Sequence, residues 1–269
     1  MHKLSGFRDY FIASLLAATV VVFFSLYLVT RRGYFFDAPP TVDPLFVPNK
    51  AIATAGMTLL AFTFLIGPLS RYFDRWDHLL AYRKEIGIVG GFLAVLHAFV
   101  SYFLLPLKFP QAKYSLDNPY TLAGLIGVFL LVFLFILSLK RVIALLEGRT
   151  WWFWQRWGLR LVIVVTLIHV YMMKWSGWVK WFTQGGGKAS AELANPWMPG
   201  LGILATLFIT WVVIVRLYES LFLFKDFGFT PKEITMDGTL RLCGRRFFIA
   251  SFVALLVAYF LVVTRWASF

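Results

Sequence analysis

Long uninterrupted apolar runs dominate the hydrophobic pattern of this chain. About 20 apolar residues is the length that an α-helix needs to cross the hydrocarbon layer of a bilayer. Backbone polar groups in lipid must be satisfied within their own segment, so each run predicts a transmembrane helix. Seven runs approach that length: Tyr10–Thr30, Ala51–Leu69, Ile86–Leu105, Tyr120–Leu139, Gly158–Met173, Pro199–Phe224 and Phe247–Thr264. The sequence therefore predicts an all-α, polytopic membrane helix bundle, with residues 1–269 in a single transmembrane domain.

Composition agrees with this fold and excludes several classes of protein. Of the 269 residues, 60% are apolar and 14% are charged, whereas soluble domains are about half apolar and about a quarter charged. These values exclude a soluble enzyme, a disordered chain and a nucleic-acid-binding module. The net charge of +13 would favour nucleic acid in a soluble chain, but cytoplasmic loops of membrane proteins also collect Lys and Arg. Membrane lipid, and not nucleic acid, is therefore the expected partner.

The distribution of Lys and Arg between the predicted loops indicates an orientation. Of the 26 such residues, 17 lie with the N-terminus and the second, fourth and sixth loops, and 9 lie with the other loops and the C-terminus. Loops that are richer in Lys and Arg face the cytoplasm. The sequence therefore predicts a cytoplasmic N-terminus and a C-terminus outside.

Two histidines are the ionisable residues that lie deep in the predicted spans. All 13 Asp and Glu residues fall in loops or at span ends, which disfavours a proton-relay pump or a cation transporter. His97 and His169 each lie eleven residues into spans of the same direction, about 16 Å along each helix. Two imidazoles at one depth are suited to be axial ligands of one haem iron, and such a pair favours electron transfer over oxygen binding. The alternative is that each histidine only forms a hydrogen bond to a neighbouring helix.

Small residues surround His97 on its own helix. Those that share its face at helical spacing are Gly87, Gly90, Ala94 and Ser101. One interpretation is that a flat macrocycle lies close to the backbone at these positions. The other is ordinary packing of small residues between helices, since Gly87 and Gly91 also form a GxxxG step.

Several stretches resemble the ferric-reductase-like transmembrane domain family. They are Gly67–Leu69 with Arg71, Arg83–Gly87 followed by Leu96-His97, and Leu146–Trp151 with Trp154–Arg156 followed by Ile168-His169. The chain is similar in style to bacterial haem-binding members, such as the membrane subunit of the periplasmic methionine sulfoxide reductase system. The resemblance implies a haem-binding core over residues 51–175, in which His97 and His169 ligate the iron.

The chain departs from the eukaryotic members of that family. Those members carry a further histidine in each ligand helix, nearer the cytoplasm, and so hold a second haem. The corresponding positions here hold Arg83 or Lys84 and Gln155 or Arg156. Arg and Lys stay protonated at neutral pH and do not ligate iron. One haem b is therefore expected, or two where a partner or another ligand contributes.

The expected function is that of a membrane b-type cytochrome. It would carry single electrons through one bis-histidine haem toward the outer face, as an electron-transfer component of an oxidoreductase system. Lys108, Lys113, Lys174 and Lys180 on the outer side are candidates to pair with haem propionates or lipid headgroups. The alternative is a non-redox membrane subunit or transporter whose intramembrane histidines only hydrogen-bond between helices.

A separate electron donor and acceptor are expected, because no flavin or nicotinamide domain is apparent in the sequence. Membrane quinol and a cytoplasmic flavin reductase are the candidate donors. A redox protein or ferric iron on the outer side is the candidate acceptor. The resemblance places the protein in a bacterial inner membrane.

Overall fold

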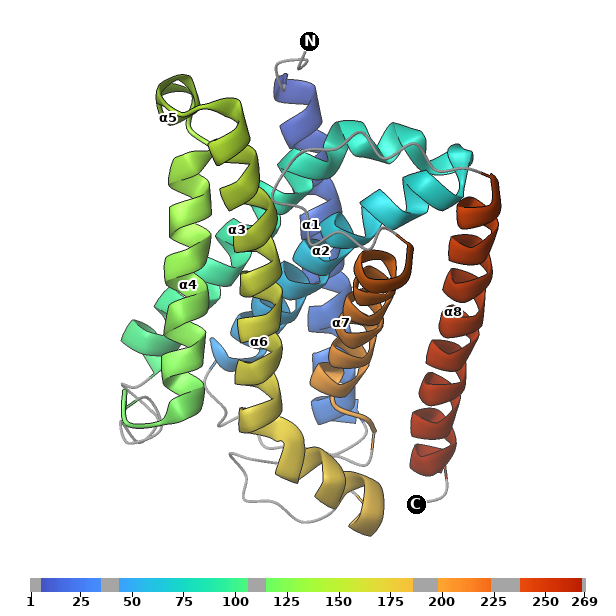
Figure 1. The fold of residues 1–269 in the computed structure, drawn as a ribbon. Coiled ribbons are helices and arrows are strands. Elements are labelled where there is room, and N and C mark those ends of the chain that lie inside the picture. The colour runs from blue at the N-terminus through green and yellow to red at the C-terminus, as the bar shows by residue number, and fades with distance from the viewer. Residues whose placement is uncertain (1–5, 35–43, 106–114, 186–197, 224–237, 268–269) are drawn as a thin grey trace.

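A computed structural model describes residues 6–34, 44–105, 115–185, 198–223 and 238–267, and in these ranges the chain is helical without strands (Figure 1). Seven helices in these ranges are long and apolar enough to cross a membrane. The main helices are α1 (Phe7–Val29), α2 (Phe46–Tyr72), α3 (Arg83–Phe99), α4 (Pro119–Leu137), α6 (Gly148–Gln184), α7 (Leu201–Tyr218) and α8 (Gly238–Ala267). Shorter helical elements are η1 (Thr30–Tyr34), η2 (Asp74–Tyr82), η3 (Val100–Leu104), α5 (Lys140–Leu145) and η6 (Glu219–Leu223). The predicted polytopic all-α bundle is confirmed.

The helix boundaries differ from the apolar runs. The second helix begins at Phe46 instead of Ala51. The fifth apolar run, Gly158–Met173, is the shortest of the seven, but the helix that contains it, α6, has 37 residues and is the longest helix in the described chain. It continues past Lys174 because interfacial Lys and Trp residues do not break a helix, and it ends at Gly185, whose φ of 84° is readily adopted by glycine.

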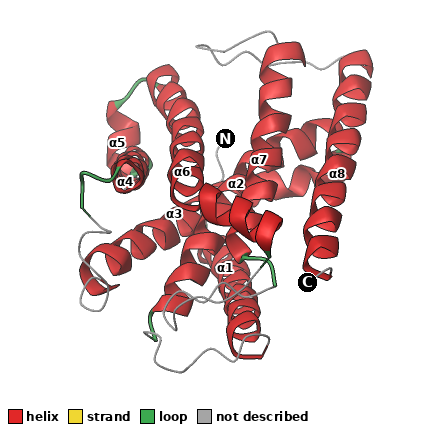
Figure 2. Ribbon diagram, turned by 90° about the horizontal axis from the view of Figure 1, so that it is seen from below, coloured by secondary structure: helices red, strands yellow, loops and turns green. Residues whose placement is uncertain are grey.

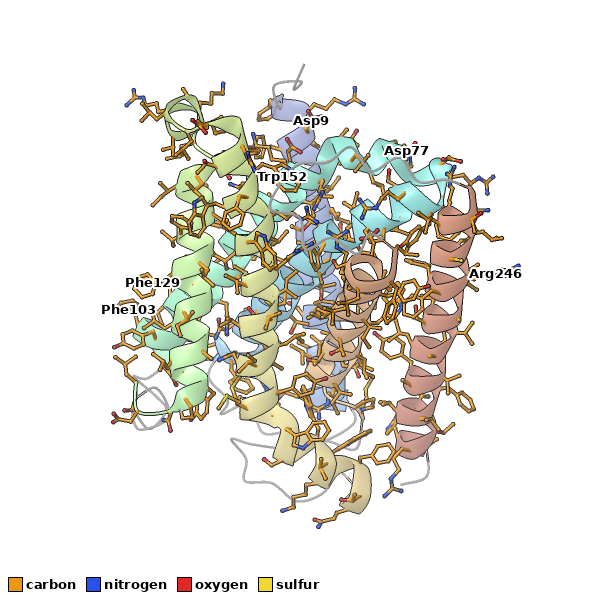
Figure 3. All side chains as sticks on the ribbon, viewed as in Figure 1. Asp9, Asp77, Phe103, Phe129, Trp152 and Arg246 are labelled. Atoms are coloured by element: carbon orange, nitrogen blue, oxygen red, sulfur yellow. The ribbon has the colours of Figure 1, made fainter. Side chains whose placement is uncertain are left out.

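Successive spans alternate in direction, so the bundle has two ends. We call the end where α1 begins the N-face and the end where α8 finishes the C-face (Figure 1). Asp9 and Asp77 both lie at the N-face, as Figure 3 shows. The C-terminal ends of α2 and α7 and the N-terminal ends of α3 and α6 also meet the N-face.

Helix α2 is the centre of the bundle. In its most apolar window, 61% of the residues are buried, whereas the other spans bury between 11% and 33%. It packs against α1, α3 and α7 along its length, and Figure 2 shows it between α6 and α7. Its buried side chains enter separate apolar clusters with α1 and α3, with α4 and α6, and with α7 and α8. Side chains of α2 can therefore reach most of the bundle interior.

Large apolar side chains cover the outside of the bundle. Phe103 and Phe129 project from its periphery in Figure 3, and both are exposed. A soluble protein rarely exposes apolar surface so extensively. Such a surface is stable in contact with lipid, so the chain is an integral membrane protein.

Candidate functional site

His97 lies near the end of α3 and is held by α2. Its Nδ1 atom lies 2.9 Å from Oδ1 of Asn49, which is buried near the start of α2. Ser101 is 3.3 Å from the same nitrogen and accepts a hydrogen bond of 2.9 Å from Asn49 Nδ2. The three side chains form a closed polar network between two helices.

His169 of α6 is held by the first turn of α4. Its Nδ1 atom lies 2.5 Å from the backbone carbonyl oxygen of Tyr120. The close approach depends on Gly124, because a Cβ atom there would lie 3.0 Å from Nδ1 and 3.1 Å from Cε1 of the histidine. Further along the same helix pair, a Cβ atom at Gly158 would lie 2.5 Å from Leu134. Glycines thus allow α4 and α6 to pack closely.

Both imidazoles are held in the same tautomer. A carbonyl oxygen only accepts hydrogen bonds, so Nδ1 of His169 carries the proton. Asn49 donates its amide to Ser101, which leaves Oδ1 as the acceptor for Nδ1–H of His97. Within the described ranges, neither Nε2 atom has a hydrogen-bond partner. A neutral imidazole that donates through one nitrogen and keeps the other open is the form that ligates metals.

The two histidines occupy the same region of the bundle. Both lie on the C-face side of the middle of their helices, and both are part-buried. α3 and α6 each pack against α4, and the electrostatic influence of His169 reaches His97. The expectation from sequence that these residues lie at similar depth agrees with this placement.

The small residues of α3 face α2, so they do not form an open surface for a macrocycle. A Cβ atom at Gly90 would lie 3.0 Å from Cβ of Leu59 and 3.2 Å from the carbonyl oxygen of Gly56. A Cβ atom at Gly56 would lie 2.9 Å from the backbone nitrogen of Ala94, and Gly87 also faces α2. Helix packing, one of the two alternatives from sequence, therefore accounts for these positions. Close packing there also brings α2 near enough to hold His97.

Basic side chains gather beyond the histidines at the C-face. Arg31 and Arg32 lie in η1, directly after α1, and each is 8% exposed; Arg31 donates a hydrogen bond of 2.8 Å to the Met198 carbonyl oxygen. Lys50 follows Asn49 directly and interacts electrostatically with both arginines and with Lys174. Such groups are suited to bind carboxylates. Lys180 is exposed in α6, and the candidates Lys108 and Lys113 lie outside the described residues.

The N-face half has no histidine pair in the described chain. Arg83, at a position where eukaryotic family members hold a ligand, donates a hydrogen bond of 3.0 Å to the carbonyl oxygen of Thr63. Gln155 donates to Ser138 Oγ at 3.0 Å, and Arg156 lies over an indole of its own helix. These side chains therefore serve contacts between helices or within them.

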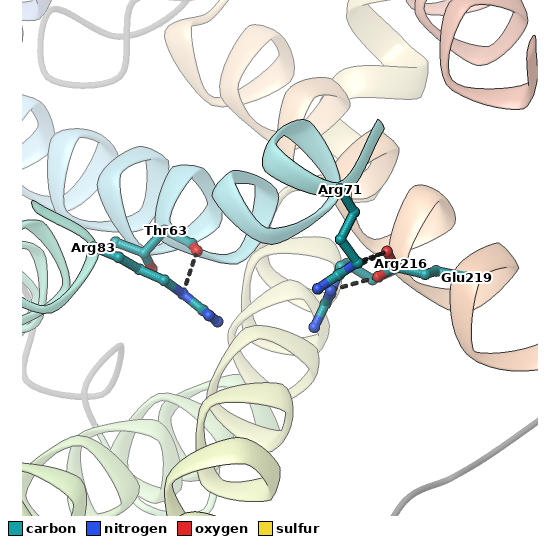
Figure 4. Close-up of polar contacts among 5 residues, drawn as sticks. All are labelled: Thr63, Arg71, Arg83, Arg216 and Glu219. Atoms are coloured by element: carbon teal, nitrogen blue, oxygen red, sulfur yellow. Dashed lines mark hydrogen bonds and ion pairs between the residues drawn. The ribbon is translucent and has the colours of Figure 1, made fainter. Parts of the chain in front are cut away.

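A buried ion cluster at the N-face was not anticipated from sequence. Glu219, which is 2% exposed, lies 2.6 Å from Nη2 of Arg71 through Oε1 and 2.5 Å from Nη1 of Arg216 through Oε2 (Figure 4). A Cβ atom at Gly67 would lie 3.2 Å from Arg71 Nη2 and 3.4 Å from Arg216 Nη1. Gly67 thus leaves room for both guanidinium groups against the backbone of α2.

Comparisons with known proteins give a family match over part of the chain. Residues 52–159 match the family described as ferric reductase like transmembrane component. The matched region contains His97 and ends before His169. The chain is also similar to Metalloreductase STEAP3 of Rattus norvegicus, with 36% identity over 87 residues that cover 28% of this chain. The alignment spans 17% of the length of that relative, so the similarity concerns one part of a longer protein.

Proposed function

We propose that this chain, in which residues 52–159 match the ferric reductase-like transmembrane family, is a membrane b-type cytochrome that binds one haem through His97 and His169. The observation that carries the proposal is the shared tautomer of the two histidines. Each donates Nδ1–H to a neighbouring helix and keeps Nε2 open. When bound, the haem would supply a one-electron redox centre that the side chains of this protein lack.

The residues around the histidines would orient and tune that centre. The Tyr120 carbonyl and the Asn49 amide fix the planes of the two rings and make Nε2 a stronger ligand. Two protein ligands leave no open position on the iron, which favours electron transfer. Lys50 and Lys174 near the ligand pair would hold the two propionates by charge-assisted hydrogen bonds.

The route of the electron follows from the position of the pair. The excess of Lys and Arg on the N-face side indicates that this face is cytoplasmic, so the histidines lie toward the outer face of a bacterial inner membrane. We propose a separate donor, either membrane quinol or a cytoplasmic flavin reductase. The name of the rat relative indicates metal reduction for that protein, and ferric iron or a redox protein is the proposed outer acceptor here.

A second candidate function has its own support. Each histidine forms a hydrogen bond to another helix, to α2 and to α4, as expected for a non-redox membrane subunit or transporter. Under this alternative the Nε2 atoms have no role, and removal of either ring affects only stability.

The visible absorption spectrum separates the two candidates. Protein purified from haem-replete cells and reduced with dithionite should show a sharp Soret band and an alpha band. Each band should be lost in His97→Ala and in His169→Ala, while both variants remain folded by circular dichroism. A colourless, folded wild-type protein would favour the second candidate.

A further inference from the structure

Three arginines point toward one another at the N-face. Arg83 extends from the start of α3 on one side, and Arg71 and Arg216 extend from the last turns of α2 and α7 on the other (Figure 4). The guanidinium group of Arg83 is turned toward the other two but lies apart from them. The electrostatic influence of Arg71 and Arg216 reaches across this space to Arg83. Like charges in such an arrangement repel one another, most of all away from water.

The carboxylate in this cluster does not balance the charge. Glu219 is the carboxylate whose charge reaches Arg83 and Arg216, and its two oxygens are already bonded to Arg71 and Arg216. Three positive charges therefore face one negative charge. Arg160 of α6 adds a further positive charge within electrostatic range of Arg216. Burying surplus charge is costly unless a counter-charge accompanies it.

Several polar atoms in the cluster have no partner. Arg216 Nε is buried without a hydrogen bond. Arg83 uses Nε for the Thr63 carbonyl oxygen, and its terminal nitrogens have no hydrogen bond to described residues. These nitrogens are hydrogen-bond donors, for which a phosphate oxygen is a suitable acceptor.

We propose that Arg71, Arg83 and Arg216 bind one phosphate group between α2, α3 and α7 at the N-face. Guanidinium forks match the oxygens of a phosphate, and a phosphate can carry the charge of about −2 that offsets the surplus. The three arginines lie at helix ends, the level at which lipid headgroups meet the bundle. The phosphate therefore belongs to an anionic lipid headgroup or to a phosphorylated molecule from the aqueous side.

This site does not depend on the proposed haem, because none of its residues contacts His97 or His169 in the described chain. Its test uses the full chain purified in detergent. One arm titrates inorganic phosphate at constant ionic strength and follows binding by calorimetry. The other arm extracts the protein from vesicles of phosphatidylglycerol or of phosphatidylcholine and counts retained lipids by native mass spectrometry.

Two variants make the test specific. Arg83→Gln removes one guanidinium while leaving the contacts of Glu219 intact, so it is expected to fold. Arg246→Gln removes an arginine that is exposed on α8, away from the cluster (Figure 3). We expect Arg83→Gln to weaken binding about tenfold or more, since charge-assisted hydrogen bonds are lost, and Arg246→Gln to leave it unchanged.

Each outcome bears on the proposal. Phosphate binding that depends on Arg83 assigns a soluble ligand, and selective retention of phosphatidylglycerol that depends on Arg83 assigns a lipid. The proposal is overturned if the wild type binds neither probe, or if Arg83→Gln binds both as the wild type does. A haem-free preparation that still binds phosphate would leave this site standing while the proposed function failed.

Discussion

The Nδ1 atom of His97 lies 2.9 Å from Oδ1 of Asn49, a residue 48 positions earlier in the chain. The contact joins the end of α3 to the start of α2 and fixes which ring nitrogen carries the proton. His169 reaches the same state through a backbone carbonyl of α4. Two different acceptors thus bind Nδ1–H of the two histidines and leave Nε2 of both rings open.

Removing the acceptor of His97 should weaken haem binding. In Asn49→Leu the ring loses its hydrogen bond and its fixed tautomer, so we expect haem affinity to fall by about 10- to 100-fold. Ser101→Ala should have a smaller effect, because Ser101 lies 3.3 Å from Nδ1 and acts mainly by orienting Asn49. Haem titration of apoprotein measures both affinities. Equal affinity in Asn49→Leu and the wild type would contradict the positioning role.

A methyl group at Gly124 should displace His169. The Cβ atom of Gly124→Ala would lie 3.0 Å from Nδ1, so the ring must move away from the Tyr120 carbonyl. We expect loss of bound haem and a destabilisation of about 1–3 kcal/mol. Gly177→Ala in α6 is the matched control, because a Cβ atom there meets nothing within 4 Å. The ratio of Soret to protein absorbance should fall in the first variant and not in the second.

Two adjacent glycines of α3 should respond oppositely to alanine. Gly90→Ala would place a Cβ atom 3.0 Å from Leu59 and 3.2 Å from a backbone oxygen, which forces α2 and α3 apart. Gly91→Ala would place one 3.5 Å from Leu131, an ordinary contact, and alanine favours the helix by about 1 kcal/mol over glycine. Thermal unfolding in detergent should show a lower Tm for the first and an equal or higher Tm for the second. A similar decrease in both would count against close α2–α3 packing at Gly90.

The buried carboxylate of Glu219 at the N-face should contribute more to stability than an exposed carboxylate does. Glu219→Gln leaves Arg71 and Arg216 without their counter-charge, and breaking a buried pair costs about 3–5 kcal/mol. Asp74→Asn breaks an ion pair with Arg241 in which Asp74 is 74% exposed, and such pairs contribute about 0–1 kcal/mol. We therefore expect a large fall in Tm for Glu219→Gln and a small one for Asp74→Asn. Comparable decreases would contradict the burial argument.

Hydropathy predicts the seven helices because membrane insertion depends on local composition, which each segment carries by itself. It does not predict that α6 continues to Gln184, since helix propensity persists after the apolar run ends. It also places Asn49 outside the second span, although α2 already begins at Phe46. The residue that positions His97 was missed for that reason.

Contacts between helices that are distant in the chain are harder to predict from sequence than the helices themselves. The two histidines were identifiable because lone imidazoles stand out in apolar spans. Arg71 and Glu219 lie 148 positions apart and appear from sequence only as charges at span ends. In the sequence Gly124 is one glycine among 20, and its structural role depends on which side chain the fold places against it. Such pairings are properties of tertiary structure.

Ligation of haem by His97 and His169 is tested most directly by the reduced-minus-oxidised visible spectrum of the purified chain and of its single histidine variants. We expect one b-type haem per chain, a low-spin spectrum in the wild type, and loss of that spectrum in both His97→Ala and His169→Ala. His78→Ala, which changes an exposed residue of η2, should keep the full spectrum. A wild-type protein without haem, or a low-spin spectrum that survives in either of the first two variants, would contradict ligation by this pair.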